Sequence, residues 1–314
     1  MGNITRRLVT DEEINLFLAS IDFEELFADE GNCKRCFPRM DDINAMLSQT
    51  ITLIKQANRD LLDVMENNTY VSDKHRTPPY ISNEKRQELI DKIVVELSSQ
   101  IRLENYDEMC LGKDGGGMLP KSGIAKDGKK AFVIIGLPAS GKSGIAKEIS
   151  DYYDAVIIDS DFVKRKIPEY CAVNGASLVH MESKMIKDGI LYSAINKGIN
   201  IVYPIIGSEY DDVVLAIRNL RHHRYDVSVI LVELDRIKAT QRALCRFLQT
   251  KRYIPLSRIL DEYSNNPSLV FYKLLQNKQF EQMPFALIDT DVPFGTAPKI
   301  MFQRNFRQIH NIIK

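Results

Sequence analysis

An eight-residue stretch, GLPASGKS at Gly136–Ser143, constrains this chain more than any other feature of its sequence. It fits the pattern G-x-x-x-x-G-K-[ST], and it lies between the apolar run at 131–136 and a segment with helical periodicity. Glycines let successive backbone N–H groups curl around phosphate oxygens, and the following helix adds the positive end of its dipole. The stretch therefore predicts a phosphate-binding loop between a strand and a helix.

Such a loop holds the phosphates of a nucleotide, and we expect ATP with Mg²⁺. Lys142 is predicted to be catalytic by reaching the β- and γ-phosphates, and the Ser143 hydroxyl is predicted to ligate the metal. The residues predicted to bind the nucleotide are Gly136, Leu137, Pro138, Ala139, Ser140, Gly141, Lys142, Ser143 and Gly144. An ordinary strand–turn–helix connection is the alternative, and the motif in this context argues against it.

The sequence from residue 130 onward alternates short apolar runs with helical patterns. The runs at 131–136, 155–159, 200–206, 227–234 and 285–289 are almost continuously apolar, as in strands covered on both faces. The helical patterns lie at 143–150, 175–196, 209–221 and 237–248. This alternation predicts an α/β fold of the P-loop kinase type, with a mostly parallel sheet flanked by helices.

The sequence before residue 130 lacks this alternation of strand and helix patterns. Residues 1–110 show helical patterns, including a capping box at Thr10–Glu13. Residues 111–129 are rich in glycine and lysine, which is typical of a linker or a mobile flap. We therefore expect an all-α N-terminal domain (1–110), a linker or flap (111–129) and a P-loop kinase domain (130–314).

Charge and apolar content bear on the expected partners. The 314 residues include 42 Lys and Arg and 42 Asp and Glu, so the formal net charge is zero. A neutral chain lacks long-range attraction to nucleic acid, which argues against such a partner. No apolar run approaches the ~20 residues of a membrane span, and the N-terminal MGNITRRLVTDEE lacks the apolar core of a signal peptide. We expect a soluble cytoplasmic protein with no membrane partner.

Two carboxylates follow the strand predicted at 155–159. Asp159 and Asp161 come at its carboxyl end, where ligands sit in open α/β sheets. If the strand continues to Asp161, alternation places both carboxylates on one side. One of the two can then take the proton of an acceptor hydroxyl while the other holds metal-bound water or orients its neighbour, and we predict that Asp159 meets the metal and the substrate. In the alternative interpretation, Asp159 ends the strand and Ser160 or Asp161 caps a helix.

Basic residues gather in QRALCRFLQTKRYIP at 241–255. Arg242 and Arg246 are one helical turn apart, and Lys251 and Arg252 follow in a loop. Arginines in a mobile segment after a late strand suit the clamping of a transferring phosphoryl group, so Arg246 and Arg252 are predicted to be catalytic. A solvated helix face is the alternative, because most charge runs are solvated.

Taken in order, GLPASGKS, the IDSD element at 158–161, the long segment from Asn174 and TKRYIP at 250–255 resemble the Zeta toxin family of P-loop kinases. The resemblance covers about 130–272. It implies transfer of a phosphoryl group from ATP, with Mg²⁺, to a sugar hydroxyl of UDP-N-acetylglucosamine. It also implies a separate helical antitoxin as a partner, or N-terminal helices that act in the same way in cis.

The resemblance also implies roles for individual residues. Asp161 would be the base, and Arg246 and Arg252 would be the lid arginines. The acidic, substrate-binding residue of the long helix would be Asp188 or, with a different gap, Glu182. His180 lies in the same segment, and a lone histidine is more often structural than catalytic.

The sequence departs from the family where the strand after the long helix ends. Zeta toxins have an acidic residue, a glycine and a threonine there, whereas this chain has YPIIG at 203–207. Loss of polar groups that meet a sugar weakens or redirects recognition. We therefore expect an intact phosphate-binding half and an altered acceptor half, with Pro204 and Ile206 forming a more apolar wall. The acceptor is then a hydroxyl of a small molecule, with nucleotide sugars among the candidates.

Two other functions stay open at this point. A polynucleotide 5′-hydroxyl kinase shares the loop and the aspartate, but it would need a basic channel with aromatic stacking partners. An autoinhibited, non-catalytic nucleotide-binding regulator would use the N-terminal helices as its interacting part. An accessory or dimerisation role fits these helices better, because amphipathic helices mostly pack into structural cores.

Overall fold

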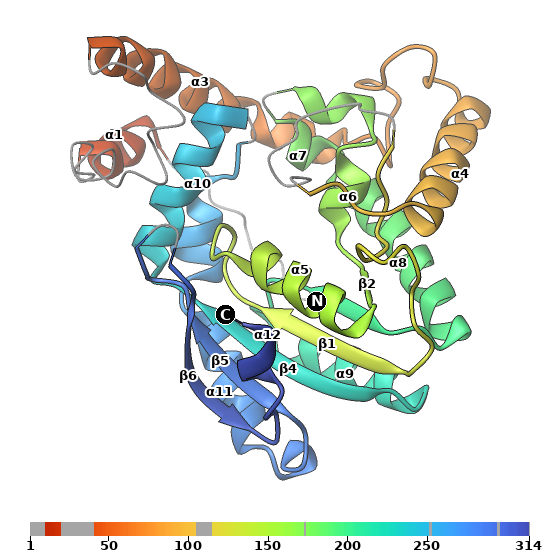
Figure 1. Cartoon of the computed structure of the whole chain (residues 1–314). Helices are drawn as coiled ribbons and strands as arrows, with labels where there is room; N and C mark the ends of the chain where they lie inside the picture. Colours follow the sequence, from red (N-terminus) through yellow and green to blue (C-terminus); the bar gives the residue numbers. More distant parts are fainter. Residues whose placement is uncertain are drawn as a thin grey trace.

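The computed structural model describes residues 10–19, 41–104, 115–172, 174–250, 253–293 and 296–313. Its centre is a six-stranded sheet with the order β2-β3-β1-β4-β5-β6 (Figure 1). The strands are β1 (Lys130–Ile135), β2 (Val156–Ile157), β3 (Ile201–Pro204), β4 (Asp226–Glu233), β5 (Phe285–Asp289) and β6 (Lys299–Arg304). Neighbouring strands pair in parallel, except that β6 is antiparallel to β5. The predicted α/β fold with a mostly parallel sheet is confirmed.

The five predicted strands are all present, and β6 is an addition. β2 is shorter than the apolar run at 155–159, because the chain turns into a helix at Ser160. β6 was not among the predicted strands because it lies at the edge of the sheet and is mostly exposed, with 61% of Met301 accessible to solvent. Edge strands need not carry the continuous apolar run that marks a buried strand.

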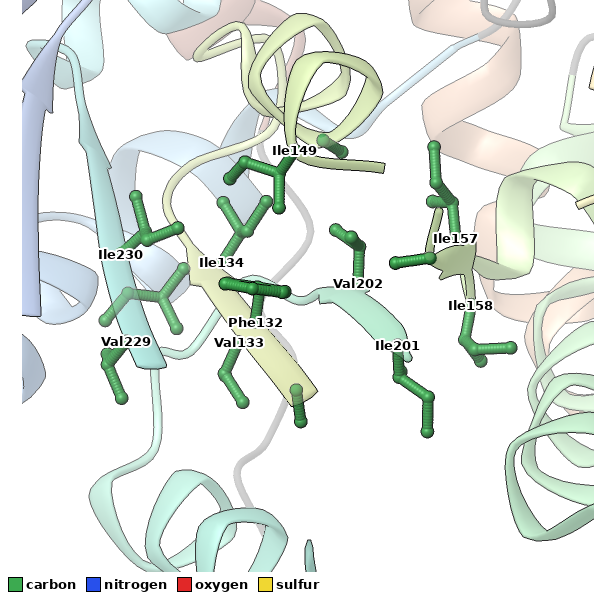
Figure 2. Close-up of a cluster of buried hydrophobic side chains, with 14 of the residues drawn as sticks. Phe132, Val133, Ile134, Ile149, Ile157, Ile158, Ile201, Val202, Val229 and Ile230 are labelled. Atoms are coloured by element: carbon green, nitrogen blue, oxygen red, sulfur yellow. The ribbon is translucent and has the colours of Figure 1, made fainter. Parts of the chain in front are cut away.

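Helices cover both faces of the sheet. Figure 2 shows Ile134 of β1 and Val202 of β3 pointing toward Ile149 of α5 (Lys142–Tyr153), whereas Ile201 points the other way. The right-handed crossovers that this strand order requires place three helices on the opposite face. They are α8 (His180–Lys197), α9 (Tyr210–His222) and α11 (Asn266–Gln276).

The helix predicted at 175–196 is two helices, α7 (Gly175–Leu178) and α8. Val179 separates them, with φ −97° and ψ 6°, which is outside helical geometry. The other short elements and the helix that follows β4 are α6 (Ser160–Lys164), the 3₁₀ turn η1 (Pro168–Cys171), α10 (Arg236–Thr250), the π-helical turn η2 (Arg258–Tyr263), the 3₁₀ turn η3 (Lys278–Phe280) and α12 (Ile309–Ile312). None of the helices in the described ranges has the length and apolar character needed to cross a membrane.

The described N-terminal helices are α1 (Asp11–Ala19), α3 (Asp41–Glu66) and α4 (Asn83–Ser99). The capping box at the start of α1 is confirmed. The Thr10 N–H donates to Oε2 of Glu13 over 2.8 Å, and the Glu13 N–H donates to Oγ1 of Thr10 over 3.1 Å. This reciprocal pair satisfies two donors that the helix start would otherwise leave without partners.

The N-terminal helices share their apolar contacts with the α/β part. Ile14 and Leu18 of α1 and Ile54 and Ala57 of α3 form one cluster with residues of α10, Leu244 and Phe247, and with Tyr253 beyond it. The side-chain amide of Asn174, just before α7, donates to the carbonyl oxygen of Ala57 over 2.8 Å. Helix α3 thus contacts both α10 and the start of α7 (Figure 1).

Helix α4 packs on the sheet region itself. Leu89, Ile93 and Leu97 belong to the same hydrophobic core as the central strands. In the segment at 115–129, the N–H of Met118 donates to the carbonyl oxygen of Leu97, and its own carbonyl oxygen accepts from Ile157 of β2. This segment therefore joins α4 to the sheet through backbone hydrogen bonds. The proposed division into three domains stays a prediction.

Candidate active site

The predicted phosphate-binding loop follows β1 and leads into α5. Its backbone has positive φ at Gly136 (155°), Ala139 (60°) and Gly141 (89°). A Cβ at Gly136 would lie 2.4 Å from the carbonyl oxygen of Val232, so only glycine fits there. Backbone turns of this kind aim N–H groups into a shared concavity, and the first turn of the following helix adds N–H groups with no intrahelical acceptor. The loop therefore has the geometry of an anion cradle.

The Lys142 side chain runs back along this loop. Its Nζ donates to the carbonyl oxygens of Gly136 (2.7 Å) and Leu137 (2.6 Å). These bonds hold the ammonium group against the cradle, where it adds a full positive charge to the partial charges of the N–H groups. Ser143 follows in the first turn of α5, which places its hydroxyl beside the same loop.

A large cavity of about 1570 Å³ opens beside the loop and takes in most of the predicted nucleotide-binding residues. The loop residues that line it are Pro138, Ala139, Gly141, Lys142, Ser143 and Gly144. Leu137 and Ser140 are buried, and together with Gly136 they shape the loop from behind. The cavity also reaches α6, α8, α9, α10 and the segment after β5, so elements far apart in the sequence contribute to one site.

Asp159 and Asp161 both line the cavity, but not because of strand alternation. The expectation that the strand continues to Asp161 is wrong, because β2 ends at Ile157 and α6 begins at Ser160. Asp159 caps that helix, with Oδ1 accepting from the N–H of Asp161 over 3.0 Å. The alternative is correct in that a capped helix follows the strand, but the cap is Asp159 and not Ser160 or Asp161. A carboxylate in the first turn of a helix is favoured by the helix dipole, which suits Asp161 as a charged group.

Cationic groups surround Asp161. Nζ of Lys164, one turn later in α6, lies 3.0 Å from Oδ1 of Asp161, and only 10% of the Lys164 side chain is exposed. His180 and Arg258 line the same part of the cavity. Burial, with help from the positive charges of Lys164 and Arg258, lowers the pKa of His180 to about 3. His180 is therefore neutral at physiological pH and is suited to hydrogen bonding rather than to carrying charge.

Two arginines of α10 face the cavity. Arg242 and Arg246 both line it, so the solvated-face alternative does not describe either of them. Nη2 of Arg242 donates to the carbonyl oxygen of Thr290 over 2.9 Å, which anchors the middle of α10 to the end of β5. Arg252, the other predicted lid arginine, lies outside the described residues. The structure therefore places one of the two predicted catalytic arginines at the site.

The geometry above agrees with the comparison to known families. Residues 121–283, more than half of the chain, match the Zeta toxin family. This chain belongs to the Zeta toxin family. Members of the family are P-loop phosphotransferases, and the match spans the loop, both aspartates and the arginines of α10. No curated protein matches the chain.

The solved structures with a similar fold include the following two. One comes from work on the PezAT chromosomal toxin-antitoxin system of Streptococcus pneumoniae, with 12% identity, a TM-score of 0.44, and coverage of 71% of this chain and 81% of that one. Another is AvrRxo1-ORF1:-ORF2 with ATP, with 15% identity, a TM-score of 0.48, and coverage of 75% and 74%. These TM-scores are too low to carry an argument about the fold. The assignment of the Zeta toxin fold therefore depends on the family match and the strand order of this chain.

The two candidates for the acidic, substrate-binding residue of the Zeta toxin helix lie in different surroundings. Asp188 lines the cavity, is half exposed, and pairs with Nζ of Lys187 over 2.8 Å. Glu182 points away, into a buried cluster with Arg86 of α4. Of these two, Asp188 is the one that the structure brings to the cavity.

The Glu182 cluster is a structural feature that sequence reasoning missed. Arg86 donates to Glu182 through Nη2 (2.6 Å) and to Glu169 through Nη1 (3.0 Å), and all three side chains are at most 3% exposed. Thr69 and Thr77 add hydrogen bonds to the two carboxylates. Burial lowers the pKa of Arg86, but the two carboxylates outweigh it and the net pKa is raised. The partners are more than 80 residues apart in sequence, so no local pattern could have indicated this cluster.

The departure from the Zeta toxin pattern lies inside the cavity. Tyr203, Pro204, Ile205, Ile206 and Gly207 all line it. Ser208 and Glu209, which follow this stretch directly and were not predicted from the sequence, line the cavity too. Polar residues just beyond the carboxyl end of a parallel strand are the signal that could have found them. This wall of the cavity therefore combines the apolar stretch with the hydroxyl of Ser208 and the carboxylate of Glu209.

Lys187 links α8 to β3 at this wall of the cavity. Its Nζ donates to the Tyr203 hydroxyl over 3.0 Å and lies 4.8 Å from the centre of the Tyr203 ring. Burial lowers the pKa of Lys187, but Tyr203 and Asp188 outweigh it, so the net pKa is raised. Lys187 is therefore charged, and it brings a desolvated ammonium group to the wall of the cavity.

The polar groups of the loop and its neighbours fit a nucleoside triphosphate and a magnesium ion. The loop has glycines with positive φ, backbone N–H groups at a helix start and the ammonium group of Lys142. These N–H and ammonium donors suit phosphate oxygens. Mg²⁺ prefers oxygen ligands and usually takes one or two from protein while the rest come from phosphates and water. The Ser143 hydroxyl and the Asp159 carboxylate line the cavity on adjacent elements and would suit that role.

Proposed function

We propose that this chain is an ATP- and Mg²⁺-dependent phosphotransferase that acts on a hydroxyl of a small molecule, with nucleotide sugars among the candidates. One observation carries the proposal. The phosphate-binding loop with Lys142, the carboxylate of Asp161 and the guanidinium of Arg246 all line a single cavity. Phosphoryl transfer needs these three kinds of group together, because its catalysis consists mainly of positioning and charge stabilisation.

The chemistry follows from these groups. The phosphates of ATP lie on the loop, with Lys142 at the β- and γ-phosphates. Asp161 takes the proton of the acceptor hydroxyl as its oxygen bonds to the γ-phosphorus, and the bond from that phosphorus to the bridging oxygen breaks to leave ADP. Arg246 faces the charge on the equatorial oxygens. Ser143 and Asp159 would hold Mg²⁺, which would supply neutralisation of phosphate charge.

The acceptor would lie between α6, α8 and the end of β3. Asp188, Lys187 and Glu209 offer polar groups there, and Ile205 and Ile206 offer an apolar surface. This mixture supports a small-molecule acceptor that differs from the sugar nucleotide implied by the family resemblance. A site that lacks hydrogen-bonding partners at a given position discriminates poorly in favour of a hydroxyl at that position.

The test is transfer of labelled γ-phosphate from ATP in the presence of Mg²⁺. The acceptors are UDP-N-acetylglucosamine, other nucleotide sugars, NAD, nucleosides and a 5′-hydroxyl oligonucleotide. Wild type should label one small molecule. Lys142→Ala should abolish the product, and Asp161→Asn should reduce its formation by a factor of about 10²–10⁴ while ATP still binds. Lys273→Ala, an exposed lysine on α11, is the matched control and should behave as wild type.

Other outcomes would assign a different function. A labelled oligonucleotide whose formation falls steeply with salt would identify a polynucleotide 5′-hydroxyl kinase. ATP binding without any product, unchanged in Lys142→Ala, would favour a nucleotide-binding regulator. An antitoxin-like protein partner stays a prediction. The contacts of α1 and α3 with α10 support a role for the N-terminal helices within the same chain.

A further inference from the structure

The cavity does not end at the groups that handle phosphate. It continues between α8 and α9 as a groove on the face of the sheet opposite α5. We call this part the distal groove, and it is lined by Leu191, Ile195, Tyr203, Ile205, Ala216 and Leu220. Tyr203 and Ile205 share the strand face of Ile201, which Figure 2 shows pointing away from α5.

The lining residues recur at helical spacing, so each helix presents one continuous face to the cavity. On α8 the residues are Lys184, Lys187, Asp188, Leu191, Tyr192 and Ile195. On α9 they are Asp212, Val213, Leu215, Ala216, Asn219 and His222, with Arg218 and Leu220 beside them. Positions three, four and seven apart lie on one side of a helix. The groove is therefore bounded by two whole helix faces, not by a few scattered contacts.

The direction of the two helices gives the groove its length. Helix α9 begins just after β3, at the carboxyl edge where the phosphate-binding loop lies, and ends before β4 starts at the opposite edge. Helix α8 begins beside Asp161 and ends before β3 starts. At 1.5 Å per residue, the stretch from Asp212 to His222 extends about 15 Å away from the phosphate site.

The chemistry of the lining changes along that length. Near the loop it is charged, with Lys142, Asp161, Lys164 and Arg246. In the distal groove aliphatic side chains predominate, with Leu191 and Ile195 on α8 and Ala216 and Leu220 on α9, and the Tyr203 hydroxyl accepts a hydrogen bond from Lys187. Polar side chains such as Asn219 and His222 stand at the exposed rim. An apolar interior with a polar rim is the usual lining of a pocket that buries a non-polar ligand group.

The size of the cavity supports the same conclusion. Pockets for one drug-sized ligand measure about 300–1,000 Å³. The cavity here is about 1570 Å³, which leaves room for a second molecule beside a nucleotide. A compact sugar at Asp161 would leave the distal groove unused.

We infer that the distal groove holds the non-polar part of an elongated acceptor whose hydroxyl lies at Asp161. The inference rests on the proposed phosphotransferase function and specifies its substrate class, an alcohol with an aliphatic or ring-bearing tail of about 10–15 Å. The aliphatic walls give affinity by removing the tail from water, and the charged end fixes the hydroxyl.

The chain contains no tryptophan, so a single introduced tryptophan reports on one place only. Tyr192→Trp puts this reporter at the groove, and Ser193→Trp puts it on the next, exposed residue, which does not line the cavity. The probes are ω-bromoalkanols from 3-bromo-1-propanol to 11-bromo-1-undecanol, because bromine quenches tryptophan on contact. We expect saturable quenching in Tyr192→Trp, with affinity rising about fourfold for each added methylene. Ser193→Trp should show only weak, unsaturable quenching that does not depend on chain length.

Two further measurements test whether the bromoalkanol binds in the distal groove. Adding Ala216→Arg to Tyr192→Trp should weaken 11-bromo-1-undecanol at least tenfold, because a charge then occupies the aliphatic wall. Saturating ATP with Mg²⁺ should leave the quenching in place, because the groove lies beyond the phosphate-binding loop. Equal quenching of the two single-tryptophan proteins, or displacement by ATP, would overturn the inference.

The two proposals fail separately. If γ-phosphate transfer depends on Lys142 but the Tyr192→Trp reporter shows no saturable quenching, the phosphotransferase function stands and the tailed acceptor is rejected. If quenching is saturable but neither 1-undecanol, tested as an added acceptor, nor any compound of the acceptor panel receives phosphate, the groove binds apolar ligands and its role as an acceptor site is rejected.

Discussion

Thr290 donates a hydrogen bond from Oγ1 to the carbonyl oxygen of Ser140 over 2.7 Å. The carbonyl oxygen of the same threonine accepts from Arg242 of α10 over 2.9 Å. One residue beyond β5 therefore connects the phosphate-binding loop to the helix that carries Arg246. The loop and the arginine helix are far apart in sequence, and Thr290 fixes them relative to each other.

Thr290→Val keeps the shape of the side chain and removes this hydrogen bond. The loop carbonyl of Ser140 then loses a buried partner, which costs about 1–3 kcal/mol. We expect ATP affinity to fall about tenfold, measured by titration with a fluorescent ATP analogue. Thr240→Val removes a comparable bond within α10, from Oγ1 to the carbonyl oxygen of Arg236, and should leave ATP affinity unchanged. An unchanged affinity in Thr290→Val would show that the connection does not shape the loop.

Gly136→Ala tests the loop directly. The added Cβ would meet the Val232 carbonyl oxygen at 2.4 Å, so the loop must shift and ATP binding should be lost. Gly189→Ala is the control, because a Cβ at this position on α8 has open space around it. It should bind ATP normally and stabilise the protein by about 1 kcal/mol, since alanine favours a helix over glycine. ATP binding retained by Gly136→Ala would contradict the described loop geometry.

Arg86→Met should strongly destabilise the fold. It would leave Glu169 and Glu182 buried without their cation, and breaking a buried ion pair on one side costs about 3–5 kcal/mol. The measurement is the free energy of unfolding in urea. Lys85→Met alters the neighbouring residue, which is exposed and pairs with Glu88, and should leave the unfolding curve where it is. Two superimposable curves would mean that the carboxylates find other partners.

His180→Asn tests the pH dependence of stability. Burial, followed by the charges of Lys164 and Arg258, lowers the pKa of His180 to about 3, against the opposing effect of Asp161. The unfolded chain takes up this proton below about pH 6.5, whereas the folded chain does so only near pH 3. Stability therefore falls as the pH drops through that window, by up to about 2 kcal/mol between pH 8 and pH 5.

His180→Asn should flatten this part of the stability curve, as measured by thermal unfolding at pH 5, 6, 7 and 8. His310→Asn, on the exposed side of α12, is the matched control and should keep the wild-type slope. A wild-type slope in His180→Asn would mean that folding does not lower the pKa of this histidine.

Local sequence determines the parts of this fold that could be predicted. The glycines and Lys142 of the loop, and the apolar runs that became β1 to β5, act through neighbours in the chain, so their pattern is visible without a structure. Asp161 lines the cavity from the first turn of a helix and not from a strand, because the capping preference of Asp159 outweighed continuation of the strand. Arg86, Thr290 and the distal groove depend on contacts between distant segments, which periodicity does not encode.

Helix α3 has a consequence for how ligands reach the site. It packs on α10 through Ile54, and its Ala57 carbonyl oxygen accepts a hydrogen bond from Asn174 at the start of α7. Helix α3 therefore connects two sides of the cavity. Widening the gap between α10 and α7 would require breaking one of these attachments. Opening the cavity on this side is therefore coupled to helix α3, whereas the proposed distal groove between α8 and α9 does not depend on these two attachments.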